Sequence, residues 1–271
     1  MVRRRRFKIS RKRYIWLAVI ALIVTAALFY FYDVYSTYST RIGVIRIRDE
    51  VIDFSYADQI ENALKDPRIR AVVVVIDSPG GTVQACFETE ERLSKLRAEK
   101  PVVVTMEQYA ASGAYLIASA SDYIFARNQT ITAGLGVIAV WISYENKFQK
   151  EGIEYFVWRS GEAKDEFAPW RSPTPEENER IQLLVDNMMR ELITRVKRNR
   201  PKVKLENLMD GSTVNGSEAL GYNLIDEIGD YHSALRKAAE LANLKEGRYI
   251  VTEMGNSPSF WDAIKQASRI L

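Results

Sequence analysis

The chain has 271 residues, of which 47% are hydrophobic and 27% charged, so it can bury a sizeable globular core. Its net charge of +3 is uneven, because residues 1–13 hold eight basic and no acidic side chains. The remainder carries 30 basic and 35 acidic side chains, which argues against a nucleic-acid-binding surface and against nucleic acid as a partner.

Residues 14–32 form an uncharged run of 19 residues with aromatic side chains at both ends. As a helix this run would be roughly 28 Å long, close to the thickness of a bilayer core. It predicts a transmembrane anchor that contacts lipid, with the basic tail 1–13 in the cytoplasm and the body outside. A cleaved signal peptide and a buried core helix are the alternatives, but the bulky aromatic end is unlike a cleavage site. A nucleic-acid-binding arm is the alternative for the arginine run.

The rest of the chain alternates between strand and helix patterns. Residues 33–40 are polar and are predicted to be a linker, and 41–250 a single domain. The run VVVVI at 72–76 is typical of a parallel strand buried on both faces. The alternation predicts an α/β fold with a parallel sheet. Strands are predicted at 42–47, 72–76, 101–105, 123–126 and 154–159, and helices at 54–64, 83–96 and 112–120.

A long amphipathic helix is predicted at 175–199. Thr174 and Glu177 have the spacing of a capping box at its start. Its apolar stripe is expected to face the core or another subunit. The C-terminal tail at 251–271 is less regular, with a small amphipathic helix expected at 260–271.

Two glycine-containing segments follow predicted strands. The first is DSPGG, with Gly80 and Gly81 before a predicted helix, where free backbone N–H groups can bind an anion or an oxyanion. A tight strand-to-helix turn without a ligand is the alternative. The second contains Ser112 and Gly113 at the start of a helix, where Ser112 could be a nucleophile or only a helix cap.

The remaining residues limit which base could activate a serine. His232 is the only histidine and is expected at the surface, which makes a Ser-His-Asp triad improbable. Cys86 is the only cysteine, so the chain has no internal disulfide or cysteine metal site, and Cys86 is expected in the core. A lysine base remains open, provided that it is held neutral, and Lys164 in SGEAK is one candidate among many lysines.

Six motifs in order resemble the signal peptide peptidase A (protease IV-like) family of membrane-bound Ser-Lys serine peptidases, which has the Clp-protease/crotonase fold. The resemblance runs from about residue 41 to about residue 245. The motifs are DSPGG at 77–81, ASGAY at 111–115, TAGLGV at 132–137, SGEAK at 160–164, the stretch from PWR at 169–171 to TPEE at 174–177, and DGSTVNGSEALGYNLIDEIGD at 210–230.

The resemblance implies that Ser112 is the nucleophile and Lys164 the general base. It also implies an oxyanion hole made by the N–H groups of Gly80, Gly81 or Gly113. No metal or other cofactor is implied. The expected substrates are signal-peptide remnants and other apolar or unfolded peptides. The family further suggests homo-oligomeric rings, in which neighbouring subunits can complete the dyad.

One motif departs from the family pattern. TAGLGV usually reads TGSIGV, so Ala133 and Gly134 stand where relatives have glycine and serine. That serine can orient the lysine, and Thr132, Thr130 or water would have to replace it here. The rival functions are a crotonase-fold enzyme acting on acyl-CoA thioesters, a non-catalytic membrane scaffold, and a different class of membrane serine peptidase.

Overall fold

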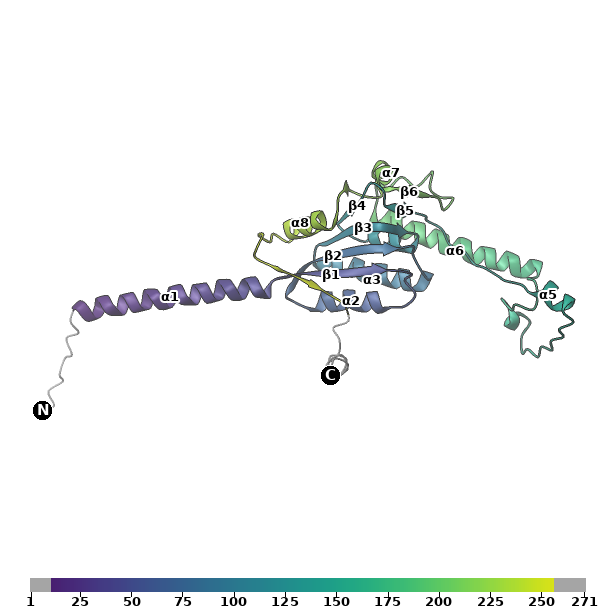
Figure 1. Ribbon diagram of the computed structural model, residues 1–271, viewed down its shortest axis with the longest axis horizontal. Helices are drawn as coiled ribbons and strands as arrows, with labels where there is room; N and C mark the ends of the chain where they lie inside the picture. The colour runs from purple at the N-terminus through teal and green to yellow at the C-terminus, as the bar shows by residue number, and fades with distance from the viewer. Residues whose placement is uncertain (1–10, 256–271) are drawn as a thin grey trace.

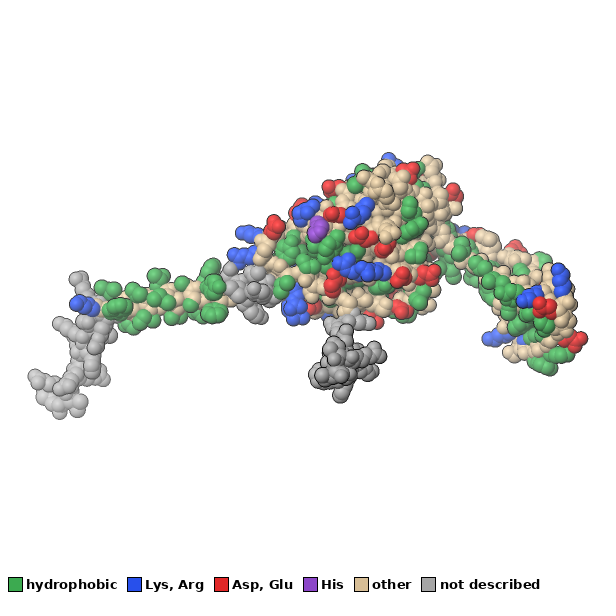
Figure 2. All heavy atoms as spheres, in the orientation of Figure 1, with side chains coloured by type: hydrophobic (Ala, Val, Ile, Leu, Met, Phe, Trp, Pro, Cys, Tyr) green, Lys and Arg blue, Asp and Glu red, His purple; other side chains and the backbone are tan. Residues whose placement is uncertain are grey.

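The computed structural model describes residues 11–255. Its first element is the long helix α1 (Arg11–Ser39), which projects from the body (Figure 1). The stretch Ile15–Tyr32 has a mean hydropathy of 2.3 and none of it is buried in the protein, so it is long and apolar enough to cross a membrane. Hydrophobic side chains cover this part of the helix (Figure 2). The basic residues 1–10 and the helix expected at 260–271 lie outside the described residues.

The linker predicted at 33–40 is helical as far as Ser39. This prediction took polar composition as a sign of a break. The segment contains neither glycine nor proline, and extending an existing helix avoids the cost of nucleating a new one. The connection between α1 and the body is therefore short, because β1 begins at Arg41.

The body is built on one eight-stranded sheet with the strand order β6-β5-β3-β2-β1-β8, while β4 pairs with β3 and β7. All pairs are parallel except β5 with β6, which confirms the predicted α/β class. The strands are β1 (Arg41–Arg48), β2 (Ile69–Ser78), β3 (Val102–Ala111), β4 (Tyr123–Ala126), β5 (Ile131–Ala133), β6 (Thr213–Asn215), β7 (Glu227–Ile228) and β8 (Ile250–Glu253).

Helices cover both faces of the sheet (Figure 1). Along β2, Val72 and Val74 join the core cluster that includes α2, α3 and α4, whereas Val73 and Val75 pack with α8 on the other face. This explains why β2 is apolar without alternation. The helices are α2 (Ser55–Lys65), α3 (Val83–Glu99), α4 (Gly113–Ser119), α5 (Glu145–Lys150), α6 (Pro175–Asn199), α7 (Gly216–Gly221) and α8 (Tyr231–Leu241).

The helix predicted at 175–199 is confirmed as α6, and Thr174 and Glu177 form the predicted capping box. The strand predicted at 154–159 is wrong, because this segment has no regular secondary structure. Its side chains are exposed and it has no strand beside it to pair with, so β propensity alone cannot make it a strand. It belongs to residues 141–174, which we call the arm. The arm includes α5 and the 3-10 turn η1 (Glu162–Asp165), and α5 lies at the far end of α6 from the sheet (Figure 1).

Candidate active site

The carboxyl ends of two central strands bring the predicted site residues together. β2 ends at Ser78 and is followed by Gly80 and Gly81, and the neighbouring strand β3 ends immediately before Ser112. The two strands are parallel, with Ser78 opposite Ala110. Ligand sites of open α/β sheets are expected beyond the carboxyl ends of such strands. The order in which the chain builds the sheet therefore places the glycine pair beside the serine.

Ser112 has an unusual backbone conformation, with φ 55° and ψ −125°. A non-glycine residue in a sparsely populated region costs about 1–3 kcal/mol and persists only where its surroundings enforce it. Here the Ser112 N–H donates to the Ala133 carbonyl at 2.8 Å, and the Ser112 carbonyl accepts from the Leu116 N–H at 3.1 Å. Ser112 does occupy the N-cap position of α4, but its side chain makes no capping hydrogen bond to the helix, so its hydroxyl is not used as a cap. Its half-buried hydroxyl instead donates to the Gly136 carbonyl at 3.4 Å.

The three glycines predicted for an oxyanion hole have different roles in the structure. The Gly80 N–H donates to the Ser78 hydroxyl at 3.2 Å, so this group is already paired. Within residues 11–255, the N–H groups of Gly81 and Gly113 have no hydrogen-bond acceptor, and both residues line the same small hollow as Ser112. Of the three predicted donors, these two are therefore available to a ligand.

Close packing explains why these positions are glycine. Gly80 has φ 115°, and a Cβ there would lie 3.0 Å from both the Gly113 nitrogen and the Ser112 Cβ. A Cβ on Gly81 would lie 2.0 Å from the Val51 carbonyl oxygen. One on Gly113 would lie 2.3 Å from the Cys86 sulfur. The backbone segments around Ser112 thus approach more closely than side chains would permit.

The hollow beside Ser112 has a volume of about 110 Å³, and its lining combines apolar side chains with polar backbone groups. Cys86 is buried as predicted, and burial raises the pKa of its thiol to about 12, which excludes a ready thiolate nucleophile. A hollow of this kind can accept an apolar side chain next to the Ser112 hydroxyl. Apart from Ser112 and the two glycines with free N–H groups, it is lined by Val83, Cys86, Phe87, Gly136, Val137, Ile138 and Leu192.

Thr132 and Thr130, the two residues expected to replace the missing serine, hydrogen-bond to backbone carbonyl groups. The buried Thr132 hydroxyl donates to the Ala110 carbonyl at 2.7 Å, and that of Thr130 donates to the Glu107 carbonyl at 2.6 Å. Both hydroxyl protons are therefore already used, and either oxygen could interact with an amine only as an acceptor. Gly134 has φ 57°, a conformation that glycine adopts without strain.

Lys164 is not in the Ser112 hollow of its own chain. It lies exposed in η1, and the neighbouring Asp165 is linked through Arg171 to Glu177 at the start of α6. Leu192, which lines the Ser112 hollow, is 15 residues further along α6, about 22 Å at 1.5 Å per residue. A single chain therefore brings together Ser112, Gly81 and Gly113 but leaves Lys164 in η1, on the arm.

Comparison with known proteins decides the family. The model of Peptidase family S49 matches residues 94–245, which include both Ser112 and Lys164. The chain belongs to peptidase family S49. This agrees with the family resemblance of its motifs.

Several relatives of this S49 chain support that assignment. A relative from Methanocaldococcus jannaschii is 32% identical over 192 residues, 70% of this chain and 61% of the relative. Protease 4 of Salmonella typhi is 34% identical over 193 residues, 70% of this chain and 31% of the relative. The chloroplastic serine protease SPPA of Arabidopsis thaliana is 26% identical over 206 residues, 74% of this chain and 30% of the relative. The chain thus spans less than two thirds of each of these proteins.

A solved structure is also similar, though distantly. It is a mutant of the 1510-N membrane-bound stomatin-specific protease in complex with a substrate peptide, with 16% identity and a TM-score of 0.46. The match covers 86% of this chain and 99% of that one. The likeness is too weak to carry any functional assignment.

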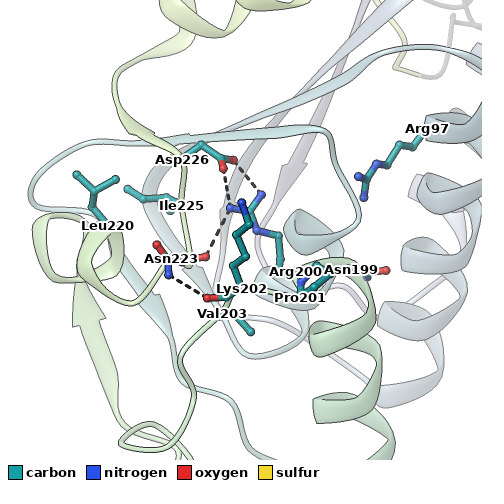
Figure 3. Close-up of a pocket in the computed structure, with 10 residues that line it drawn as sticks. All are labelled: Arg97, Asn199, Arg200, Pro201, Lys202, Val203, Leu220, Asn223, Ile225 and Asp226. Carbon is teal, nitrogen blue, oxygen red and sulfur yellow. Dashed lines mark hydrogen bonds and ion pairs between the residues drawn. The ribbon is translucent and has the colours of Figure 1, made fainter.

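Two other features of the S49 chain lie outside the Ser112 site. His232 is exposed, as predicted, next to the ring of Tyr231. A hollow of about 370 Å³ lies at the C-terminal end of α6, where Arg200 forms a bidentate pair with Asp226 (Figure 3). The Asp226 carboxylate also accepts from the Ile124 N–H at 2.8 Å, so this pair ties α6 to β4. We assign no ligand to this hollow.

Sequence reasoning missed the polar cluster at the start of α6. Arg171 contacts both Asp165 and Glu177 through its guanidinium group, which lowers the pKa of both carboxyl groups, that of Glu177 to about 2. The spacing of six residues on each side of Arg171 could have suggested such a link, but the sequence does not show that the three side chains converge.

Proposed function

We propose that the chain is a membrane-anchored serine endopeptidase in which Ser112 attacks the peptide bond. The observation that carries this proposal is the site itself. Ser112 has a strained backbone conformation beside two unpaired N–H groups, those of Gly81 and Gly113. An acyl-transfer enzyme needs these two components, a presented nucleophile and preorganised donors for the oxyanion.

In the proposed reaction, neutral Lys164 accepts the proton of the Ser112 hydroxyl as the serine oxygen attacks the scissile carbonyl. The carbonyl oxygen becomes an oxyanion, which the N–H groups of Gly81 and Gly113 stabilise. Lys164 then donates its proton to the leaving amine as the peptide bond breaks. Water hydrolyses the acyl-enzyme, releasing the second product and restoring the serine.

The base in this proposal comes from a neighbouring copy of the chain. Lys164 is carried by the arm, at the other end of α6 from the Ser112 hollow. The arm and α6 also expose large apolar side chains that contact with another copy would bury, as expected for a homo-oligomer. They include Ile142, Phe156, Trp158, Leu183 and Leu184.

The substrates that fit the site best are apolar or unfolded peptides, among them signal-peptide remnants. The hollow beside Ser112 is small and the side chains that line it are mostly apolar, so it favours an apolar side chain next to the cleaved bond. Anchoring by α1 would keep the active site near the membrane, with the basic tail 1–13 in the cytoplasm and the body on the opposite side.

Alanine substitutions combined with mixing of two chains test this proposal. Ser112→Ala and Lys164→Ala should each abolish cleavage of a fluorogenic apolar peptide by the detergent-solubilised full chain. Co-expression of the two inactive chains should restore part of the activity, because Ser112 of one copy can meet Lys164 of another. Full turnover by either single variant would refute the dyad, and failure of the mixture to regain activity would refute its formation between copies.

Labelling separates this proposal from the rival functions. A fluorophosphonate should label wild-type chain but not Ser112→Ala. Absence of labelling of an intact wild-type oligomer would favour a non-catalytic scaffold, and turnover of an acyl-CoA thioester without peptide cleavage would favour the acyl-CoA enzyme.

A further inference from the structure

We propose that Arg171 is a positioning residue that fixes the orientation of the turn carrying Lys164, in the copy of the chain that supplies the base. The inference rests on the proposed function, because it concerns how Lys164 reaches the Ser112 of another copy. It assigns a role to the cluster of charged side chains formed by Asp165 and Arg171 of the arm and Glu177 of α6, which the proposed reaction does not itself use.

Arg171 directly holds the residue after Lys164. Its side chain is only 18% exposed, and that of Asp165 only 6%. The guanidinium Nε and Nη2 donate to the two Asp165 carboxylate oxygens, each at 3.1 Å, and Nη2 also donates to the Asp165 carbonyl oxygen at 3.2 Å. Three bonds from one planar group to both the side chain and the backbone of a residue leave its peptide little rotational freedom.

The same guanidinium joins this turn to α6. Its Nη1 and Nη2 donate to the two carboxylate oxygens of Glu177 at 2.7 and 2.6 Å. Glu177 is in turn the capping-box residue of α6, whose carboxylate accepts from the Thr174 N–H at 2.9 Å. Arg171 therefore connects a short 3-10 turn to the end of a helix of 25 residues, which is the longest element in this part of the protein.

The other end of that helix is fixed to the body near the Ser112 hollow. Glu90 of α3 is completely buried and accepts from Arg195 at 2.8 Å, from Arg198 at 3.1 Å and from Asn199 at 2.8 Å. A rigid connection thus runs from the helix that follows the glycine pair, along α6, to the turn that bears Lys164. Loss of Arg171 would leave the Thr174–Glu177 capping box and the Glu90 contacts in place but would break the link between α6 and the turn, where Asp165 would keep only its ion pair with Arg159.

A second contact keeps the guanidinium plane in place. The Arg171 guanidinium lies over the Trp141 ring, 5.0 Å from its centroid. The Trp141 indole N–H donates to the carbonyl oxygens of Ala168 and Arg171 itself, both at 3.1 Å. Lysine can supply the charge at this position, but it can neither make the bidentate contacts nor stack on the ring in the same way. Arg171→Lys is therefore the variant that separates charge from orientation.

The test places Arg171→Lys in one copy at a time, using differently tagged full-length chains co-purified in detergent. One mixture combines Ser112→Ala/Arg171→Lys chains with Lys164→Ala chains, so that the altered residue lies in the copy that supplies the base. The other combines Ser112→Ala chains with Lys164→Ala/Arg171→Lys chains, so that it lies in the copy that supplies the serine. Arg180→Lys, introduced in the same two ways, is the matched control, because Arg180 pairs with Glu166 at 2.6 Å and is 45% exposed.

We expect Arg171→Lys to lower kcat by at least about tenfold, with KM unchanged, only when it lies in the base-supplying copy, since small misplacements of a catalytic group have such effects. Arg180→Lys should have no effect in either mixture. Equal activity of the two Arg171→Lys mixtures would overturn the inference. It would also be overturned if the mixture with Arg171→Lys in the base-supplying copy had a native near-UV circular dichroism spectrum and an undiminished kcat. Inactivity of the unmodified Ser112→Ala and Lys164→Ala mixture would instead refute the dyad between copies, and the inference with it.

Discussion

The contact between Gly113 and Cys86 allows a quantitative test of the site geometry. Gly113 lies in α4 with no positive φ, so an alanine there would by itself gain up to about 1 kcal/mol in helix propensity. The added Cβ would, however, lie 2.3 Å from the Cys86 sulfur and 2.9 Å from its Cβ. Overpacking in a buried site costs about 3 kcal/mol at the upper end of the usual range. Gly113→Ala should therefore destabilise the protein by about 2 kcal/mol.

Cys86→Ala should relieve most of this clash, because it removes the sulfur and leaves only the 2.9 Å contact. Alone it should cost about 1 kcal/mol for the lost buried atom. The double variant should also be only about 1 kcal/mol less stable than wild type, so the two changes should couple favourably by about 2 kcal/mol.

Thermal unfolding of the full chain, followed by far-UV circular dichroism, measures this cycle. A loss of 2 kcal/mol corresponds to roughly 4–8 °C for a domain of this size. Gly221→Ala is the control, because a Cβ at that helical position meets nothing within 4 Å, so this change should not lower Tm and can raise it through helix propensity. Additive effects of the two substitutions, within about 0.5 kcal/mol, would refute the reasoning that space beside Cys86 is what requires glycine at 113.

Further predictions concern the site, the arm and the anchor. Gly80→Ala should abolish peptidase activity and lower the unfolding free energy by at least about 1–3 kcal/mol, because φ is 115° and the Ser112 Cβ lies 3.0 Å from the new Cβ. The control Gly152→Ala, with φ 66° and nothing within 4 Å, should keep full activity. Ser112→Ala should change the unfolding free energy by less than about 1 kcal/mol, since its hydroxyl makes one weak hydrogen bond; a larger loss would indicate a structural serine. Glu177→Gln should lower Tm most above pH 4.5, and the difference from wild type should vanish as the pH falls towards 2, since the native carboxyl has a pKa of about 2 against an ordinary 4.5; a constant difference would contradict the Arg171 pairing. Deletion of residues 1–39 should release the chain from membranes on fractionation, and retention of the shortened chain there would argue against α1 as its anchor.

Much of the fold was predictable because its strands and helices carry strong local patterns. The apolar run at 72–76 lies inside β2, and the capping box at Thr174 marks the first turn of α6. The predictions were wrong for two segments whose secondary structure depends on neighbouring elements rather than on their own composition. The residues at 154–159 favour a strand but have no pairing partner, and those at 33–39 look like a linker but continue an existing helix.

The site was predictable only where the chain itself brings residues together. Gly81 and Ser112 follow adjacent parallel strands, so the sequence pattern and the sheet rule suffice to pair them. The different role of Gly80 was not visible, because its N–H pairs with a hydroxyl only two residues away. The position of Lys164 could not be read from the sequence either, since it depends on how the arm packs around Arg171.

The distance from the Ser112 Oγ to the Lys164 Nζ in the assembled oligomer tests the central claim most directly. An experimental structure of the full chain in detergent would supply it. Our account predicts that the amine of one copy lies about 2.6–3.2 Å from the hydroxyl of its neighbour, or slightly further in the absence of substrate. An oligomer in which every Lys164 amine points into solvent, away from all copies of Ser112, would contradict it.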